Sequence, residues 1–198
     1  MRHGTSRLAL AEETGSDLDE VTLACAKGGD PRAQAALVHR YERPIFSLLW
    51  RMVGPDREVV DDLTQETLLR ALRALARFEY DGKARLITWI LTIATRLALD
   101  HIRTLRPRHD TVSVPGAVPV TLPRPDQEAD RRALAGALMQ AVNALGPQYR
   151  AAFLLREVHG LSYEEISRAL SIDVGTVRSR LARARGSLQV ALAELHDE

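Results

Sequence analysis

The stretch from Leu161 to Arg185 constrains this chain most, because it predicts two short helices joined by a tight turn. Ser162 and Glu165 have the S-x-x-E spacing of a capping box, which indicates that the first helix begins near Ser162. The apolar period is interrupted after Leu170, and a second helix is expected to begin near Val174 or the glycine that follows it. This order of elements predicts a helix-turn-helix.

The second of these helices combines an apolar inner face with an arginine-rich surface. Val177 and Leu181 face inward at i, i+4. The rest of its surface carries polar and basic side chains, namely Thr176, Arg178, Ser179, Arg180, Arg183 and Arg185. Arginine neutralises phosphate and forks onto guanine O6 and N7 in the major groove, so this helix is a candidate for reading DNA. A merely solvated arginine face is the plainer alternative, which the agreement of capping box, turn and arginine cluster disfavours.

Composition sets limits on the rest. A chain of 198 residues holds one large or two small domains, and a net charge of +1 does not by itself indicate a polyanionic partner. The single Cys25 excludes an intrachain disulfide and a cysteine-based metal site, and no metal or cofactor is expected. No signal peptide and no run of about 20 apolar residues is present, so we expect a soluble, cytoplasmic protein without membrane insertion.

The first part of the chain predicts a helical domain over residues 19–105, after a flexible tail over residues 1–18. Helices are expected over 19–27, from Asp30 to about Val53 with a break or kink at Pro44, from Asp56 to about Ala76, and over 86–105. In the second of these helices the expected inner face is Ala33, Ala36, Leu37 and Tyr41. In the fourth helix the expected core face is Leu86, Ile90, Ile93 and Leu97.

The second part predicts another helical domain, over residues 126–198. Five prolines between Thr104 and Pro125 preclude a long helix, so residues 106–125 are expected to form an extended, semi-rigid linker. Helices over 126–145 and 148–158 then precede the helix-turn-helix, whose second helix is expected to extend to about Leu195. No strand-like alternation occurs. The predicted fold is therefore all-α, with two small helical domains joined by a proline-rich linker.

Two further groups of side chains are candidates for contacts with a partner. The helix over 56–76 has one apolar face and a second, mainly polar face that contains a large apolar residue; this face is Asp62, Gln65, Glu66, Leu69 and Arg73. The following loop and helix carry an aromatic residue, a glycine and a basic cluster, namely Tyr80, Gly82, Lys83, Arg96, Arg103 and Arg106.

Three stretches in this order resemble the extracytoplasmic-function group (group 4) of the sigma-70 family of RNA polymerase sigma factors. They are residues 61–72, residues 88–94 with 97–103, and residues 145–185. The resemblance implies a sigma region 2 before the linker and a sigma region 4 after it. It also implies that the protein is no enzyme, that it binds core RNA polymerase and promoter DNA, and that an anti-sigma factor is a further partner.

The resemblance assigns a role to each candidate group. The face from Asp62 to Arg73 corresponds to the surface that binds core polymerase. The group from Tyr80 to Arg106 corresponds to the surface that recognises and melts the −10 element, with Tyr80 stacking on a flipped base. The group from Thr176 to Arg185 corresponds to the −35 reader, in which Arg178, Ser179 and Arg183 face the bases. This chain departs from the family at Arg96, where asparagine is common, which puts base selection at −10 in doubt.

Two other functions fit parts of the sequence. A conventional helix-turn-helix regulator with a helical dimerisation domain explains residues 162–185 but neither the acidic face at Asp62 nor the basic cluster from Arg96 onward. An enzyme that holds a divalent cation through Asp61, Asp62 and Glu66 is a third hypothesis, which the absence of a second acidic helix disfavours. Dependence of DNA binding on polymerase separates the first alternative from a sigma factor.

Overall fold

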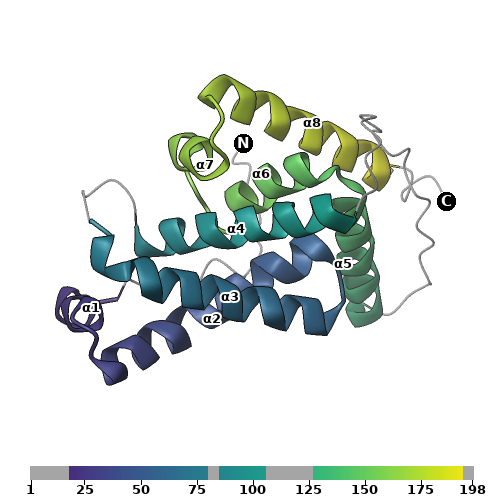
Figure 1. Cartoon of the computed structure of the whole chain (residues 1–198). Helices are drawn as coiled ribbons and strands as arrows, with labels where there is room; N and C mark the ends of the chain where they lie inside the picture. The colour runs from purple at the N-terminus through teal and green to yellow at the C-terminus, as the bar shows by residue number, and fades with distance from the viewer. Residues whose placement is uncertain (1–17, 80–84, 106–126, 194–198) are drawn as a thin grey trace, which may run out of the picture.

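The computed structural model describes residues 18–79, 85–105 and 127–193 (Figure 1). Within these ranges the regular secondary structure is entirely helical, as predicted. The elements are α1 (Glu20–Lys27), α2 (Pro31–Val53), α3 (Arg57–Ala74), the 3₁₀ turn η1 (Leu75–Arg77), α4 (Leu86–Leu105), α5 (Gln127–Ala144), α6 (Pro147–Glu157), α7 (Tyr163–Leu170) and α8 (Val174–Ala193). The predicted tail, the loop with Tyr80, Gly82 and Lys83, and the linker from Arg106 lie outside the described residues.

Aspartate side chains begin the first three helices. Asp19 accepts a hydrogen bond from the backbone N–H of Thr22 (2.9 Å), and Asp30 accepts one from that of Ala33 (2.8 Å). Asp56 caps α3 in the same way. Each carboxylate satisfies one of the backbone donors that a helix N-terminus leaves unpaired, so these three helices start where the sequence predicts.

Helix α2 runs unbroken past Pro44, although a break was one of the two outcomes that the sequence predicted. Residues on both sides of the proline, such as Tyr41 and Ile45, are buried against the rest of the core, and α3 and α4 pack along α2. This packing offsets the local cost of the proline. The predicted inner face was wrong at Ala36, which is exposed because it lies about 60° around the helix from Ala33 and about 100° from Leu37.

Helix α4 lies in the middle of the molecule. It packs against α2 and α3 on one side and against α6 and α7 on the other (Figure 1). The sequence predicted a single core face, and this is only partly correct: Leu86 and Ile90 are buried, whereas Ile93 and Leu97 are partly exposed. The second buried side comes from residues that a one-faced prediction left out, namely Ile87, Leu91, Ala94 and Ala98.

The two predicted domains touch each other. Helix α2 packs against α5 and α6, α4 packs against α6 and α7, and the buried apolar residues of both halves form one continuous cluster. No helix in the described parts of the chain has the length and apolar character that crossing a bilayer requires. The two helical halves therefore share a core, and the surfaces that carry the candidate residues are held in one arrangement.

Candidate nucleic-acid interface

The capping box at the start of α7 is formed as predicted. The backbone N–H of Glu165 donates to the Ser162 hydroxyl (3.1 Å), and the backbone N–H of Ser162 donates to Glu165 Oε2 (2.7 Å). These two bonds satisfy two backbone donors at the helix start. The first helix of the helix-turn-helix therefore begins beside Ser162, where the sequence predicts its start.

The turn after α7 depends on Ser171, which the sequence analysis did not single out. Ser171 has φ 54° and ψ 48°, in the left-handed region that glycine or asparagine usually occupies. The backbone N–H of Ile172 donates to the carbonyl of Ser167 (3.1 Å) and closes the turn. A left-handed residue is needed here because the chain must leave α7 sharply to enter α8.

Asp173 organises the start of α8. Its Oδ1 accepts from the backbone N–H of Thr176 (2.8 Å) and its Oδ2 accepts from the Thr176 hydroxyl (2.6 Å). The bond from the Thr176 hydroxyl, and to a smaller extent the bond from its backbone N–H, hold the pKa of Asp173 below its ordinary value. A Cβ added to Gly175 would lie 2.9 Å from Asp173 Oδ1, so the glycine leaves room for the carboxylate. The hydroxyl of Thr176 therefore takes part in capping the helix.

Helix α8 has the two faces that the sequence predicts. Val177 and Leu181 are buried, and Ala184 and Leu188 extend the same stripe. Arg178, Ser179 and Arg183 are exposed on the opposite side. Because the stripe anchors the helix on its neighbours, the exposed side remains available to a partner.

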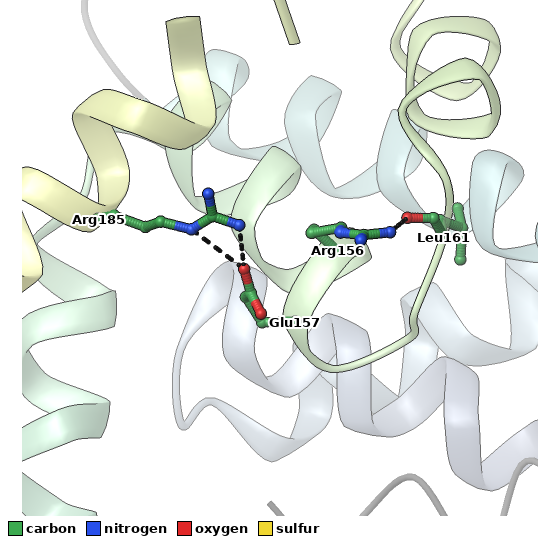
Figure 2. A network of polar contacts seen from close by, with 4 residues as sticks. All are labelled: Arg156, Glu157, Leu161 and Arg185. Atoms are coloured by element: carbon green, nitrogen blue, oxygen red, sulfur yellow. Dashed lines mark hydrogen bonds and ion pairs between the residues drawn. The ribbon is translucent and has the colours of Figure 1, made fainter. Parts of the chain in front are cut away.

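Helix α6 holds three of the α8 arginines at the side of the exposed face. Arg180 contacts the Gln148 amide oxygen (3.5 Å), and Arg183 donates to the Tyr149 hydroxyl (3.1 Å). Arg185 forms two hydrogen bonds with Glu157 Oε1 (3.3 and 2.7 Å), which raise the pKa of Arg185 (Figure 2). No pattern in the sequence predicted these contacts, because they join residues about 30 positions apart.

The turn between α6 and α7 is fixed by another arginine, which the sequence analysis did not assign. Arg156 donates to the Leu161 carbonyl (2.8 Å; Figure 2). Its guanidinium lies 5.3 Å from the centre of the Tyr163 ring. Both contacts bridge the segment that joins the two helices. They position α7 relative to α6 and so contribute to the orientation of the helix-turn-helix.

The candidate face of α3 points away from the core. Val60, Thr64, Thr67, Leu68 and Ala71 are buried on the inner side of the helix. Asp62, Gln65, Leu69 and Arg73 are exposed, and Glu66 is half-buried. Leu69 is 45% exposed, which is unusual for a large apolar side chain on a helix with a buried side of its own.

Two carboxylates of α3 pair with arginines of their own helix. Glu66 lies 2.6 Å from Arg70 Nε, and Asp61 lies 3.4 Å from Arg57 Nε. No group of three potential ligands able to hold a metal ion occurs in the described residues. Asp61 and Glu66, two of the three carboxylates of the enzyme hypothesis, are thus each paired with an arginine in the structure.

The predicted basic cluster is divided among different partners. Arg96, in the middle of α4, forms hydrogen bonds with the end of α7 rather than with its own helix. Arg103 pairs with Asp100 on α4 (3.2 Å), and both side chains are exposed. Arg106 lies outside the described residues, as do Tyr80, Gly82 and Lys83. The described residues thus place Arg103 at the surface and Arg96 at a contact between the two halves.

Across the described residues the fold is entirely helical, and its last two helices form an arginine-faced helix-turn-helix. The sequence matches two family descriptions, "Sigma-70 region 2" over residues 37–108 and "Sigma-70, region 4" over residues 135–188. It is 38% identical over 180 residues to the ECF RNA polymerase sigma factor SigC of Mycobacterium tuberculosis, covering 88% of this chain and 92% of that protein. It is 33% identical over 186 residues to the RNA polymerase sigma-H factor of Pseudomonas aeruginosa, covering 89% and 95%.

The chain belongs to the extracytoplasmic-function RNA polymerase sigma factors. It resembles two solved structures in fold. The structure of CnrH in complex with the cytosolic domain of CnrY aligns with a TM-score of 0.63 at 23% identity, covering 88% of this chain and 97% of that chain. The sigma factor RpoE in complex with the anti-sigma factor NepR from Bartonella quintana aligns with a TM-score of 0.58 at 24% identity, covering 83% and 97%. The family favours an initiation factor over the conventional regulator, and over a catalyst.

Proposed function

We propose that this protein binds core RNA polymerase and directs transcription initiation at promoters whose −10 and −35 elements it recognises. The observation that carries the proposal is the helix-turn-helix itself. Its second helix is capped at Asp173, anchored by a buried stripe, and faces outward with Arg178, Ser179 and Arg183. A helix of this kind enters the major groove and contacts base edges.

Within α8, base contacts and phosphate contacts fall on different residues. Arg178 and Ser179 lie on the exposed side, and the contact of Arg183 with Tyr149 steadies its guanidinium. Arg180 and Arg185 flank this patch beside α6 and are assigned to phosphates, together with the helix start near Thr176. Base contacts set sequence preference, whereas phosphate contacts add affinity to every promoter.

The face of α3 formed by Asp62, Gln65, Glu66, Leu69 and Arg73 is the proposed contact with core polymerase. It mixes carboxylates with an exposed leucine, which suits a basic and partly apolar partner helix. The −10 surface is assigned to Tyr80, Gly82, Lys83, Arg96, Arg103 and Arg106, on the basis of the resemblance. A melted strand is held there by stacking and by charge.

Charge reversal on α3 tests the core contact. The double variant Asp62→Lys/Glu66→Lys is expected to lower affinity for purified core polymerase by more than tenfold while leaving the unfolding transition unchanged. Glu20→Lys/Glu42→Lys is the matched control, because it makes the same change of net charge at two exposed positions on α1 and α2. Equal binding of core polymerase by the two folded variants would contradict the assignment.

We also propose that an anti-sigma factor controls the protein. RpoE of Bartonella quintana was solved in complex with an anti-sigma factor, and CnrH with a cytosolic partner domain. Both share their fold with this chain. Because the protein would act on RNA polymerase, we expect it to function in the cytoplasm. No step of the proposed function requires a cofactor.

A further inference from the structure

A residue outside the helix-turn-helix contacts one of its proposed base-reading side chains. Tyr149 lies in the first turn of α6, and its hydroxyl accepts a hydrogen bond from Arg183 Nη1 on α8 (3.1 Å). The two residues are 34 positions apart in the sequence. A guanidinium carries several N–H donors, so the bond to Tyr149 leaves a pair of them for the O6 and N7 atoms of a guanine.

The Tyr149 contact orients the guanidinium and leaves its charge intact, because a hydroxyl, unlike a carboxylate, is neutral. A long arginine side chain loses rotamer freedom when it binds DNA, and this loss opposes binding. The contact orders Arg183 beforehand, so that less freedom is lost on DNA. Arg178 differs, because the described residues include no hydrogen-bond partner for its guanidinium.

The ring of Tyr149 lies directly against Gly146. A Cβ added to Gly146 would lie 3.2 Å from Tyr149 Cδ2 and 3.6 Å from Cε2. Gly146 has φ −56° and ψ 143°, a conformation that any residue adopts, so the backbone does not require glycine here. The glycine instead provides room for the ring, and a side chain at this position would force the ring and its hydroxyl to move.

The turn that carries Gly146 is fixed by Arg150. The Arg150 guanidinium donates to the carbonyl of Asn143 and to that of Leu145 (3.0 Å), where α5 ends. The backbone N–H of Tyr149 donates to the Gly146 carbonyl (2.9 Å) and closes the first turn of α6. Because α6 packs on α8, these bonds hold the Tyr149 hydroxyl at a fixed place beside the exposed face of α8.

We propose that Tyr149 is the positioning residue for base recognition by Arg183, so that a side chain outside the helix-turn-helix sets the preference at one base pair of the −35 element. This rests on the proposed function, in which Arg183 faces the bases. Tyr149 touches no base itself and acts through Arg183. The preference set by Arg178 is independent of Tyr149.

Two substitutions disturb the positioning in different ways. Tyr149→Phe removes the hydroxyl and keeps the ring beside Gly146. Its matched control is Tyr163→Phe, which removes the same atom from a tyrosine of α7 whose ring faces Arg156. Gly146→Ala keeps the hydroxyl and displaces the ring. Its control is Gly136→Ala on α5, where nothing lies within 4 Å of the added Cβ.

Transcription by holoenzyme, assembled from purified core polymerase and each variant, is measured across promoters with a randomised −35 element. Tyr149→Phe should reduce the preference at the base pair that Arg183→Ala identifies by roughly two- to tenfold, the range expected for one hydrogen bond. Gly146→Ala should reduce the preference at the same base pair. The base pair that Arg178→Ala identifies should keep its preference in both variants. The two control variants should match the parent protein at both base pairs.

Double variants separate positioning from a general loss of stability. Combined with Arg183→Ala, Tyr149→Phe should change no base preference further, whereas combined with Arg178→Ala it should keep its full effect. If Tyr149→Phe leaves the preference at the Arg183 base pair unchanged, or lowers it equally at every base pair, the proposal is overturned while the parent's −35 preference upholds the proposed function. If the parent holoenzyme shows no −35 preference, the proposed function fails and the positioning role fails with it.

Discussion

Helices α4 and α8 have the same length and both carry arginines, yet the protein uses them differently. Each has 20 residues. Helix α4 is covered on two sides, and its Arg96 caps a helix of the other half. Helix α8 is anchored by one apolar stripe and leaves Arg178 at the surface. The comparison shows that the packing around a helix, and not its arginine content, decides which arginines are free to meet DNA.

The largest expected effect concerns packing in the two helices. Ile90→Ala in α4 should lower the free energy of unfolding by about 2–5 kcal/mol, because Ile90 is fully buried and the substitution leaves a cavity. Val190→Ala in α8 should change it by no more than about 0.5 kcal/mol, because Val190 is 57% exposed. Urea unfolding measures both. Similar losses for the two variants would show that α8 is as enclosed as α4.

The second effect concerns base contacts on α8. Arg178→Ala or Arg183→Ala should cost roughly 1–3 kcal/mol of promoter binding and relax the preference at one −35 position. Arg185→Ala should weaken all promoters about equally and reduce the salt slope by about one unit. Transcription across a randomised −35 library at two salt concentrations separates these cases. If the Arg178 and Arg183 variants lost activity equally on all −35 sequences, these two arginines would contact phosphates only.

The third effect is a pH dependence at a histidine beside Arg51 of α2. His159 follows α6, and no hydrogen-bond partner for its enclosed Nε2 is found in the described residues. Burial, and then the charge of Arg51 on α2, lower the pKa of His159 from 6.5 to about 4. The neutral ring therefore contributes stability that is fully present above pH 6.5 and is lost as the pH falls toward 4.

The predicted loss between pH 7 and pH 5 is roughly 2 kcal/mol of unfolding free energy. His159→Gln should remove this part of the pH dependence, whereas His39→Gln, at an exposed position on α2, should retain it. Urea unfolding at the two pH values provides the comparison. An unchanged pH dependence in His159→Gln would show that another group is responsible.

The smallest effect compares two glycines of α8. Gly175→Ala places a Cβ against the Asp173 carboxylate and disturbs the helix cap, whereas nothing lies within 4 Å of a Cβ added to Gly186. Gly186→Ala should stabilise the helix through propensity alone. We expect the Tm of Gly175→Ala to lie about 2–4 °C below that of Gly186→Ala. Equal Tm values would show that Asp173 does not fix the start of α8.

Local features of this fold followed from the sequence, and contacts between its halves did not. The helix starts near Asp19, Asp30 and Asp56 and the capping box at Ser162 depend on residues a few positions apart, so local spacing was enough to predict them. The buried stripe of α8 followed from helical period in the same way.

The hydrogen bond from Arg96 to Ala169 and the one from Arg150 to Met52 join residues about 70 to 100 positions apart. The second buried side of α4 likewise depends on helices of the other half. No periodicity within one helix contains that information. For the same reason the sequence predicted Arg96, Arg103 and Arg106 as one basic cluster, whereas Arg96 and Arg103 have different partners in the structure. The departure from asparagine at Arg96 was visible in the sequence, and its physical use became visible only in the contact with α7.

Transcription with purified core polymerase on a library of genomic fragments, with transcript 5′ ends mapped by sequencing, tests the central claim most directly. The account predicts new start sites only when core polymerase and this protein are both present. Those sites should share one −10 and one −35 sequence, and Asp62→Lys/Glu66→Lys should abolish them. No new start sites in the presence of core polymerase, together with tight binding to specific fragments by the protein alone, would contradict the account and indicate a conventional helix-turn-helix regulator.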